Sequence, residues 1–333
     1  MLRKYNLLVI LSLLALIDLS GQDLHYSQFF NSPLNFNPGL TGVFNGDQRY
    51  QLNYRRQWQN VPVDYISADI AADFKIRSRN SDNFVGVGGL INYDKAGDLN
   101  LKLTEFNGMA SYSLVLDQNN IITPGVSVSF LQRSFDQEGA RTGSQWDGLA
   151  YNPTFPAEFI GEESISYLDF GAGVNYRYQA STRTYLDIGV AIHHINGPKD
   201  KFSPNGVYDS KRPQLISAGV MTNFRISKDL DILINGLYAK QDAYNEIVAN
   251  VQAKVYLSKV KDKALYLGIG YRDGDAWYPM IAFDYGQVYG AFSYDMNISD
   301  FDIATDGRGG PEISLRYIFS KIPDGPYRPC PIY

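Results

Sequence analysis

Apolar and polar side chains alternate in several segments of about ten residues, and this alternation constrains the fold more than any other feature. In residues 168–178, LDFGAGVNYRY, every second position from Leu168 to Tyr178 is apolar or aromatic, and the positions between them are polar or glycine. Residues 247–257 and 265–272 follow the same rhythm. Successive side chains of a β-strand point to opposite faces, so these segments predict strands with one apolar and one polar face.

Alternation of this kind fits a soluble β-sandwich as well as a barrel in lipid, and two further features favour the barrel. The polar face is rich in glycine and charge, unlike the exterior of a typical sandwich. Aromatic residues also gather at the ends of candidate strands, as in the girdles of membrane barrels: Tyr176, Tyr178, Tyr271, Trp277, Tyr278, Tyr285, Tyr289 and Tyr317. We therefore predict an all-β fold, a transmembrane antiparallel β-barrel of the outer-membrane type.

A slip of one residue in strand register would turn Arg177, Lys254 and Arg272 toward lipid. Each basic side chain near the bilayer midplane costs roughly 2 to 4 kcal/mol, so the predicted faces are strongly specified.

Composition excludes several other classes of protein. The chain is 20% charged and its mean hydropathy is -0.24, which is too polar for a helical membrane protein. Its single cysteine, Cys330, cannot form an internal disulfide, and its net charge of -5 argues against nucleic acid as a partner.

The first residues have the pattern of a secretory signal peptide. Arg3 and Lys4 precede an apolar run from 7 to 17, and the small residues Ser20 and Gly21 follow it. A membrane anchor is the alternative, but the run is shorter than the roughly 18 to 20 residues that a spanning helix needs. We predict that residues 1–21 are removed.

Residues 48–320 contain about fourteen candidate strands, an even number, as single-chain bacterial barrels have. The three longest connections, 133–164, 195–212 and 298–310, are the fifth, seventh and thirteenth in order. Outer-membrane barrels have long loops outside and short turns in the periplasm. All three are odd-numbered, so they lie at the same end of the barrel, which we assign to the outside. The sequence therefore predicts an integral outer-membrane protein with both termini in the periplasm.

Residues 22–47 form an irregular segment that fits neither period. Its prolines and glycines exclude a regular helix or central strand, yet its aromatic side chains gain about 1.5 to 3 kcal/mol each from full burial. We predict that it folds as a plug inside the barrel or across its periplasmic mouth, rather than as a disordered leader. The candidate plug residues are Phe29, Phe30, Phe36, Asn37 and Pro38.

The predicted outer loops are the expected binding surface. Exposed aromatic residues often anchor interfaces, and the loop from 133 to 164 carries Trp146, Tyr151, Phe155 and Phe159. The alternative is that these side chains contact one another and cap the barrel. Asp306, in the run SDFDIATDGRGG at 299–310, is a further partner-binding candidate. That run does not fit a calcium loop, because Ala304 stands where a ligand is needed.

No pattern of catalytic or cofactor-binding residues emerges. His193 and His194 are adjacent, so in a strand they point to opposite faces and cannot bind one metal together. The GVGGL run at 86–90 departs from the dinucleotide-binding fingerprint. We predict no enzyme, no cofactor and no metal site.

Residues 321–333 extend past the last strand and contain four prolines, which predict an extended tail. Located in the periplasm by the parity argument, the tail could bind a periplasmic partner through Tyr327, Pro329 and Cys330.

Four stretches together resemble the PorP/SprF family of outer-membrane proteins, which is associated with type IX secretion and gliding motility in Bacteroidetes. They are DLHYSQFFNSPLNFNPGLTG at 23–42, YRRQW at 54–58, ATDGRGGPEISLRYIF at 304–319 and CPIY at 330–333. The chain departs from the family at Gly39, where alanine is usual, and at Leu24, where proline is common.

The resemblance implies a barrel that binds or anchors a secreted cargo protein, an adhesin with a C-terminal sorting domain, at the cell surface. It also implies contact with membrane lipid and with other type IX or gliding components, among which periplasmic lipoproteins are candidates. A channel or transporter for small solutes or hydrophobic ligands remains the alternative.

Overall fold

The computed structural model describes residues 23–58, 65–97, 99–136, 142–156, 158, 163–199, 211–300 and 302–320. The predicted signal peptide, Phe159 and the tail residues Tyr327, Pro329 and Cys330 lie outside the described residues.

The described chain consists mainly of strands joined by turns. The strands are β1 (Gln48–Gln57), β2 (Tyr65–Arg77), β3 (Phe84–Ala96), β4 (Leu101–Val115), β5 (Asn120–Ser134), β6 (Ser164–Ser181), β7 (Thr184–His193), β8 (Leu215–Arg225), β9 (Leu230–Gln241), β10 (Tyr244–Tyr256), β11 (Lys263–Arg272), β12 (Ala276–Tyr285), β13 (Val288–Asn297) and β14 (Arg308–Phe319). Short helical turns are η1 (Phe29–Asn31), α2 (Pro33–Phe36), η2 (Pro38–Leu40), η3 (Gly143–Gln145) and α3 (Asp302–Thr305). No helix among the described residues is long and apolar enough to span a membrane.

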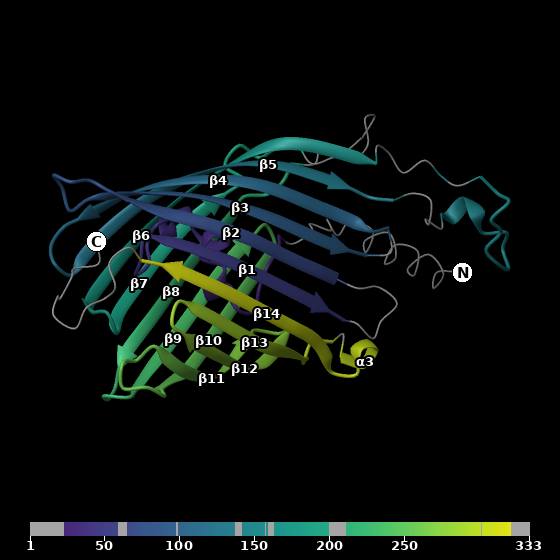
Figure 1. The fold of residues 1–333 in the computed structure, drawn as a ribbon. Helices are drawn as coiled ribbons and strands as arrows, with labels where there is room; N and C mark the ends of the chain where they lie inside the picture. Colours follow the sequence, from purple (N-terminus) through teal and green to yellow (C-terminus); the bar gives the residue numbers. More distant parts are fainter. Residues whose placement is uncertain are drawn as a thin grey trace, which may run out of the picture.

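These fourteen strands of the described chain close into an antiparallel barrel (Figure 1). Each strand pairs with its neighbours in sequence, and β1 closes the ring by pairing with β14, with Gln48 opposite Phe319. Closure removes the unpaired sheet edges, which is the condition for a sheet to span a bilayer. The prediction of a barrel of about fourteen strands is confirmed.

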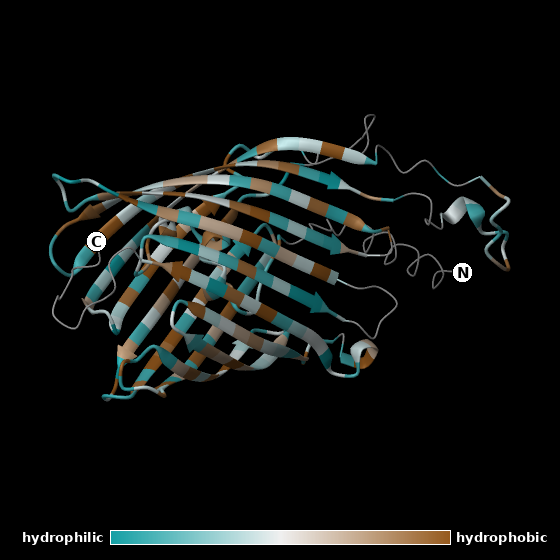
Figure 2. Cartoon of the chain, in the orientation of Figure 1, coloured by the Kyte–Doolittle hydropathy of each residue, from teal (hydrophilic) through white to brown (hydrophobic). Residues whose placement is uncertain are grey.

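The two faces of the wall differ as the alternation predicts. In β6 the outward side chains of Leu168 and Phe170 are 54% and 43% exposed, whereas the inward Asp169 and Asn175 are 4% and 1% exposed. Apolar and polar residues alternate in the same way along the strands of Figure 2. The exposed apolar residues form the surface that faces lipid.

Two residues of the predicted aromatic girdle lie elsewhere. Tyr178 and Trp277 face outward and are 39% and 38% exposed, as expected for a girdle. Tyr278 and Tyr289 are 0% and 4% exposed and lie in the lumen. The prediction was wrong for these two because strand ends cluster aromatic residues on both faces, and only the register assigns each one to a face.

The barrel has two unlike ends. One end, the turn end, holds short connections such as 182–183 and 286–287. The other, the long-connection end, holds α3 and the connections between β5 and β6 and between β7 and β8, and residues 142–156 of the first lie beyond the wall in Figure 1. The start of β1 and the end of β14 are both at the turn end, because they pair with each other.

The segment before β1 runs through the lumen from one end to the other. Asp23 accepts hydrogen bonds from Arg212, which precedes β8 at the long-connection end. At the turn end, the Asp47 amide donates to the Phe319 carbonyl, at 2.9 Å. Sequence parity placed both termini on one side. The start of β1 and the end of β14 do lie at the same end of the barrel. However, Asp23 and Ser320, the first and last described residues, lie at opposite ends.

Candidate functional site

The N-terminal segment, residues 23–47, folds into successive short turns because proline and asparagine punctuate it. Pro33 occupies the first position of α2 and Pro38 that of η2, where the missing N–H costs nothing. Between them Asn37 caps η2, its Oδ1 accepting from the Gly39 nitrogen at 2.7 Å. Three compact turns therefore replace the extended chain that the composition alone would allow.

One side of the segment meets the wall through glycine, in a region that we call the glycine contact (Gly39 with Thr123, Gly125 and Asn175). A Cβ atom on Gly125 would lie 2.7 Å from the Gly39 nitrogen, and one on Gly39 would lie 2.7 Å from the Thr123 carbonyl oxygen. Only glycine lets two backbones approach this closely. Asn37 Nδ2 also donates to the Val174 carbonyl, at 3.0 Å. Both glycines are needed for the segment to reach the surface of β5 and β6.

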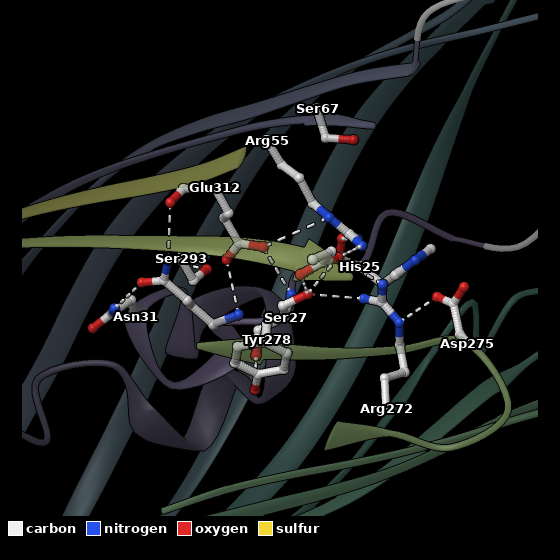
Figure 3. A network of polar contacts seen from close by, with 12 residues as sticks. His25, Ser27, Asn31, Arg55, Ser67, Arg272, Asp275, Tyr278, Ser293 and Glu312 are labelled. Carbon is white, nitrogen blue, oxygen red and sulfur yellow. Dashed lines mark hydrogen bonds and ion pairs between the residues drawn. The ribbon is translucent and has the colours of Figure 1, made fainter. Parts of the chain in front are cut away.

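On the opposite side of the lumen lies a set of buried charges that we call the charge cluster (Arg55, Arg272, Asp295 and Glu312). Each is at most 1% exposed. Arg55 and Arg272 extend from different strands toward the same point (Figure 3), and both donate to Asp295 Oδ2, at 2.6 and 2.8 Å. Arg55 Nε lies 3.6 Å from Glu312 Oε2. Arg272 Nε also donates to Asp275 Oδ2, at 2.5 Å, so each of the two buried guanidinium groups has two carboxylate partners.

The charge cluster binds the backbone of the segment directly. The amides of Ser27 and Gln28 donate to the Glu312 carboxylate at 2.9 and 2.8 Å, and Ser27 Oγ donates to Asp295 at 2.8 Å. The Tyr278 hydroxyl donates to the Ser27 carbonyl, at 2.7 Å (Figure 3). Hydrogen bonds to ionised groups are about twice as strong as neutral ones, so residues 27 and 28 are fixed in position.

A second group of charges, the end clamp, holds Asp23 at the long-connection end. The Asp23 carboxylate accepts from Arg212 and lies 2.5 Å from His194 Nε2. The other ring nitrogen of His194 contacts Asp169, and Arg212 Nη1 donates to the Tyr167 hydroxyl at 2.9 Å. His194 has left the strand, with φ of 58°. All these partners come from connections or strand ends at one end of the barrel.

The end clamp shifts the protonation of its members. Burial alone raises the pKa of Asp23, but the charges of Arg212 and His194 outweigh it and hold this pKa well below its ordinary value. Burial alone lowers the pKa of His194, but the Asp23 charge and the hydrogen bonds to Asp169 and Asp23 raise it to about 9. His194 is therefore charged at neutral pH, and the clamp is an ionised network.

The predicted plug residues come together in the lumen. Phe29, Phe36 and Asn37 are 4%, 6% and 0% exposed, and Pro38 is also buried. Phe30 is half-buried, and its ring centroid lies 5.6 Å from that of Phe29. That the segment closes the pore to solutes stays a prediction.

The aromatic residues predicted to bind a partner lie in the longest connection. Trp146, Tyr151 and Phe155 are 58%, 36% and 40% exposed, and Leu149 beside them is 91% exposed. The backbones of Trp146 and Tyr151 form an isolated bridge, which holds this part of the connection as a small hairpin. The described part of the connection thus presents apolar side chains to solvent.

Asp306 lies apart from these aromatic residues, in the turn after α3. Its side chain is 86% exposed and lies 3.5 Å from Arg308 Nη2. The described residues contain no group of three or more His, Cys, Asp or Glu side chains that could hold a metal ion.

Sequence reasoning missed the charge cluster and the end clamp. Arg272 was assigned to the polar face, but nothing in its neighbourhood pointed to Asp295. The available signal was the set of charged residues at inward positions of strand ends, such as Arg55 and Glu312, which a barrel interior must pair.

Comparisons with known proteins extend these observations. The family model described as type IX secretion system membrane protein PorP/SprF matches residues 19–317. A search of curated proteins finds no match.

Among solved structures, the toluene transporter TbuX of Ralstonia pickettii aligns with a TM-score of 0.51 and 10% identity, over 87% of this chain and 94% of that chain. A deltaS2 mutant of the monoaromatic hydrocarbon channel TodX aligns with a TM-score of 0.51 and 10% identity, over 86% and 93% of the two chains. A FadL homologue of Pseudomonas aeruginosa aligns with a TM-score of 0.48 and 12% identity, over 85% and 93%. The first two likenesses show the fold, an outer-membrane type of barrel.

Proposed function

Since this chain belongs to the PorP/SprF family of type IX secretion system membrane proteins, we propose that it is a non-enzymatic outer-membrane barrel that binds a secreted cargo protein at the cell surface. The cargo is an adhesin with a C-terminal sorting domain, and it binds at the long-connection end. The turn end faces the periplasm, where other type IX or gliding components, including lipoproteins, have access to the barrel.

The observation that carries this proposal is the apolar surface of the 142–156 stretch. Trp146, Leu149 and Phe155 are exposed by 58%, 91% and 40% on a connection that extends beyond the wall. Large aromatic residues dominate the binding energy of protein interfaces, and exposed apolar groups in a patch favour a protein partner. Asp306 lies at the same end and belongs to the same proposed surface.

The occupied lumen also favours a binding role over free conduction. The N-terminal segment contacts β5 and β6 through the glycine contact and β11, β13 and β14 through the charge cluster. A segment fixed to opposite walls obstructs the path that a solute would take through the lumen.

A co-purification experiment tests the proposal. Membranes of the native host, which supply the cargo, are solubilised in mild detergent, and proteins recovered with the tagged barrel are identified by mass spectrometry. Replacing Trp146 and Phe155 together with alanine should reduce recovery of the cargo at least tenfold, as expected for the loss of anchor residues. The matched control is Ile303→Ala, which removes a 92% exposed apolar side chain at the same end from another connection. Equal recovery of cargo with all three proteins would contradict the proposal.

A pocket in the lumen favours a second candidate function, transport of a small hydrophobic ligand. At the long-connection end a cavity of about 70 Å³ lies between Phe29 and Phe36 of the segment and Leu215, Leu237 and Ala239 of the wall. These side chains suit a small apolar group, and Asp23, His25 and Glu246 also line the cavity. The likeness to TbuX is one of fold, so the pocket is the support for this candidate.

Proteoliposomes separate the two candidates. Vesicles with the purified protein should neither swell in sugar solutions nor take up toluene faster than empty vesicles if the barrel is a cargo partner. Toluene uptake that Ala239→Phe abolishes would support the transporter, because the added ring fills the pocket. Free diffusion of sugars would contradict a closed lumen.

A further inference from the structure

A chamber in the lumen remains open beside the N-terminal segment. Its volume is about 230 Å³, and it lies toward the turn end, bounded by Phe30, Leu40 and Phe44 of the segment and by the wall from β6 to β14. An apolar cavity of about 150 Å³ is already large enough to hold benzene. The segment leaves this side open because the glycine contact holds η2 against β5 and β6.

Four cations line this chamber, and three of them have carboxylate partners. Arg49 Nε lies 2.8 Å from Asp73. Arg177 meets Asp187 through two hydrogen bonds, at 2.8 and 2.5 Å. Lys254 Nζ lies 2.8 Å from Asp284 Oδ2, a chamber residue on β12.

The fourth cation, Arg316, has neither an ion pair nor a hydrogen bond among the described residues. Its guanidinium lies over the Tyr289 ring, 4.2 Å from the ring centroid. In register, Arg316 stands opposite Gln51 of β1 and Tyr289 of β13, so neither neighbouring strand supplies a carboxylate. The chamber therefore has one positive charge in excess and a planar fork of five N–H donors that is open to an acceptor.

The other side chains that line the chamber indicate which kind of molecule carries the acceptor group. Tyr185, Tyr256 and Tyr266 contribute aromatic rings, and Leu233 and Met221 contribute apolar surface. The Tyr256 and Tyr266 hydroxyls already donate to Asp231 and Asp284, at 2.9 and 2.5 Å. Asn223, Asn235 and Gln252 add amide groups to the lining. A single guanidinium matches one carboxylate in a bidentate manner, and the tyrosine rings suit a flat body.

We propose that the chamber is a binding site for an organic carboxylate, with Arg316 holding the carboxylate and the tyrosine and apolar walls holding an aromatic or apolar body. The ligand enters from the turn end, where Thr182, Tyr185 and Ile318 line the chamber. The same chemistry is presented by a free organic acid and by a polypeptide that ends in an aromatic residue.

Titration calorimetry of the full mature chain in detergent micelles, with benzoate as the probe, tests this site. Benzoate should bind saturably, and benzamide, which has the same shape without the charge, should bind at least tenfold more weakly. Arg316→Gln should weaken benzoate binding at least tenfold, and Arg316→Lys should weaken it less, because lysine keeps the charge but loses the fork. The matched control is Arg308→Gln, which removes a 60% exposed guanidinium from the other end of the same strand and should leave benzoate binding unchanged.

Two outcomes identify the source of the carboxylate. If a short peptide ending in tyrosine displaces benzoate and its C-terminally amidated form does not, the site accepts chain termini. If neither peptide displaces benzoate, the site takes free organic acids.

Other outcomes overturn the proposal. It fails if neither benzoate nor the free-acid peptide binds saturably, if benzamide binds the unaltered protein as tightly as benzoate, or if Arg316→Gln and Arg308→Gln have equal effects. The benzoate and benzamide comparison needs only the unaltered protein, so it remains decisive if Arg316→Gln does not fold.

Discussion

The charge cluster and the glycine contact lie on opposite sides of the lumen and hold the same N-terminal segment by different forces. On the side of β11, β13 and β14, the buried Glu312 carboxylate accepts from the amides of Ser27 and Gln28, and Asp295 accepts from the Ser27 hydroxyl. On the side of β5 and β6, no charge is involved, and the absence of side chains at Gly39 and Gly125 lets backbones meet. The first contact depends on compensation of charge, and the second depends on shape alone.

This difference predicts unequal sensitivity to substitution. A buried charge that loses its partner costs far more than the pair was worth, whereas one excess methyl group against the backbone is relieved when the segment moves away from the wall, typically at about 1 to 3 kcal/mol. The charge cluster should therefore be the more fragile of the two contacts, although the glycine contact is the tighter one sterically.

The largest expected effect is that of Asp295→Asn. Asp295 is shared by Arg55 and Arg272, so its neutralisation removes one carboxylate from both buried guanidinium groups and leaves Arg55 with Glu312 and Arg272 with the partly exposed Asp275. We expect a loss of about 3 to 5 kcal/mol in the free energy of unfolding, measured by guanidinium denaturation in detergent micelles. Asp273→Asn, an exposed position at the same end, is the control and should change stability by less than about 0.5 kcal/mol. A similar small loss in both variants would show that the cluster is not held by charge.

The open chamber can be compared with the lipid-facing surface by substituting two adjacent residues of β9, one on each face of the wall. Ile234 faces lipid and is 44% exposed, whereas Leu233 lines the chamber. Ile234→Arg should cost about 2 to 4 kcal/mol in the free energy of unfolding in lipid vesicles, because it puts a charge into hydrocarbon. Leu233→Arg should cost less than Ile234→Arg, because polar side chains that line the chamber, such as Asn235 and Gln252, can accept hydrogen bonds from its guanidinium. Equal costs at the two positions would mean that the chamber is dry or filled.

The sequence predicts much of the barrel because the information is local. Alternation within residues 168–178 is enough to place Asp169, Asn175 and Arg177 on the inner face, and the structure agrees. The odd parity of the long connections also follows from counting along the chain.

The sequence does not predict the partners inside the lumen, because they are distant in the chain. Ser27 and Asp295 are 268 residues apart, and nothing near either one indicates the other. Aromatic density predicted that residues 22–47 are buried, but not that Asp23 reaches the long-connection end. The path of the segment depends on which strands face each other across the closed ring, and closure is a property of the whole sheet.

The glycine contact should show a smaller effect than the charge cluster. Gly125→Ala places a methyl group against Pro38 and Gly39, and we expect a loss of about 1 to 3 kcal/mol in the free energy of unfolding. Gly108→Ala on the neighbouring strand β4 is the control, because the nearest atom to an added Cβ, the Val128 carbonyl oxygen, lies 4.0 Å away. If the segment leaves the lumen rather than shifting, Gly125→Ala should also make proteoliposomes permeable to sugars, and Gly108→Ala should not.

The end clamp should show the smallest effect, and its effect should depend on pH. The pKa of His194 is raised from an ordinary value of 6.5 to about 9, so the folded state binds the proton more tightly than the unfolded state. The stability that His194 contributes is therefore fully present below about pH 6.5 and is lost as the pH rises through about 9. Comparing the protein with His194→Gln isolates this contribution from other groups that titrate in the same range.

The difference in free energy of unfolding between the two proteins should be about 1 to 2 kcal/mol at pH 6 and should approach zero by pH 10. A difference that stays constant over this range would mean that His194 holds Asp23 by packing rather than by charge. In that case the ionic part of the clamp would be the pair of Arg212 with Asp23, and His194 would contribute to the clamp by packing.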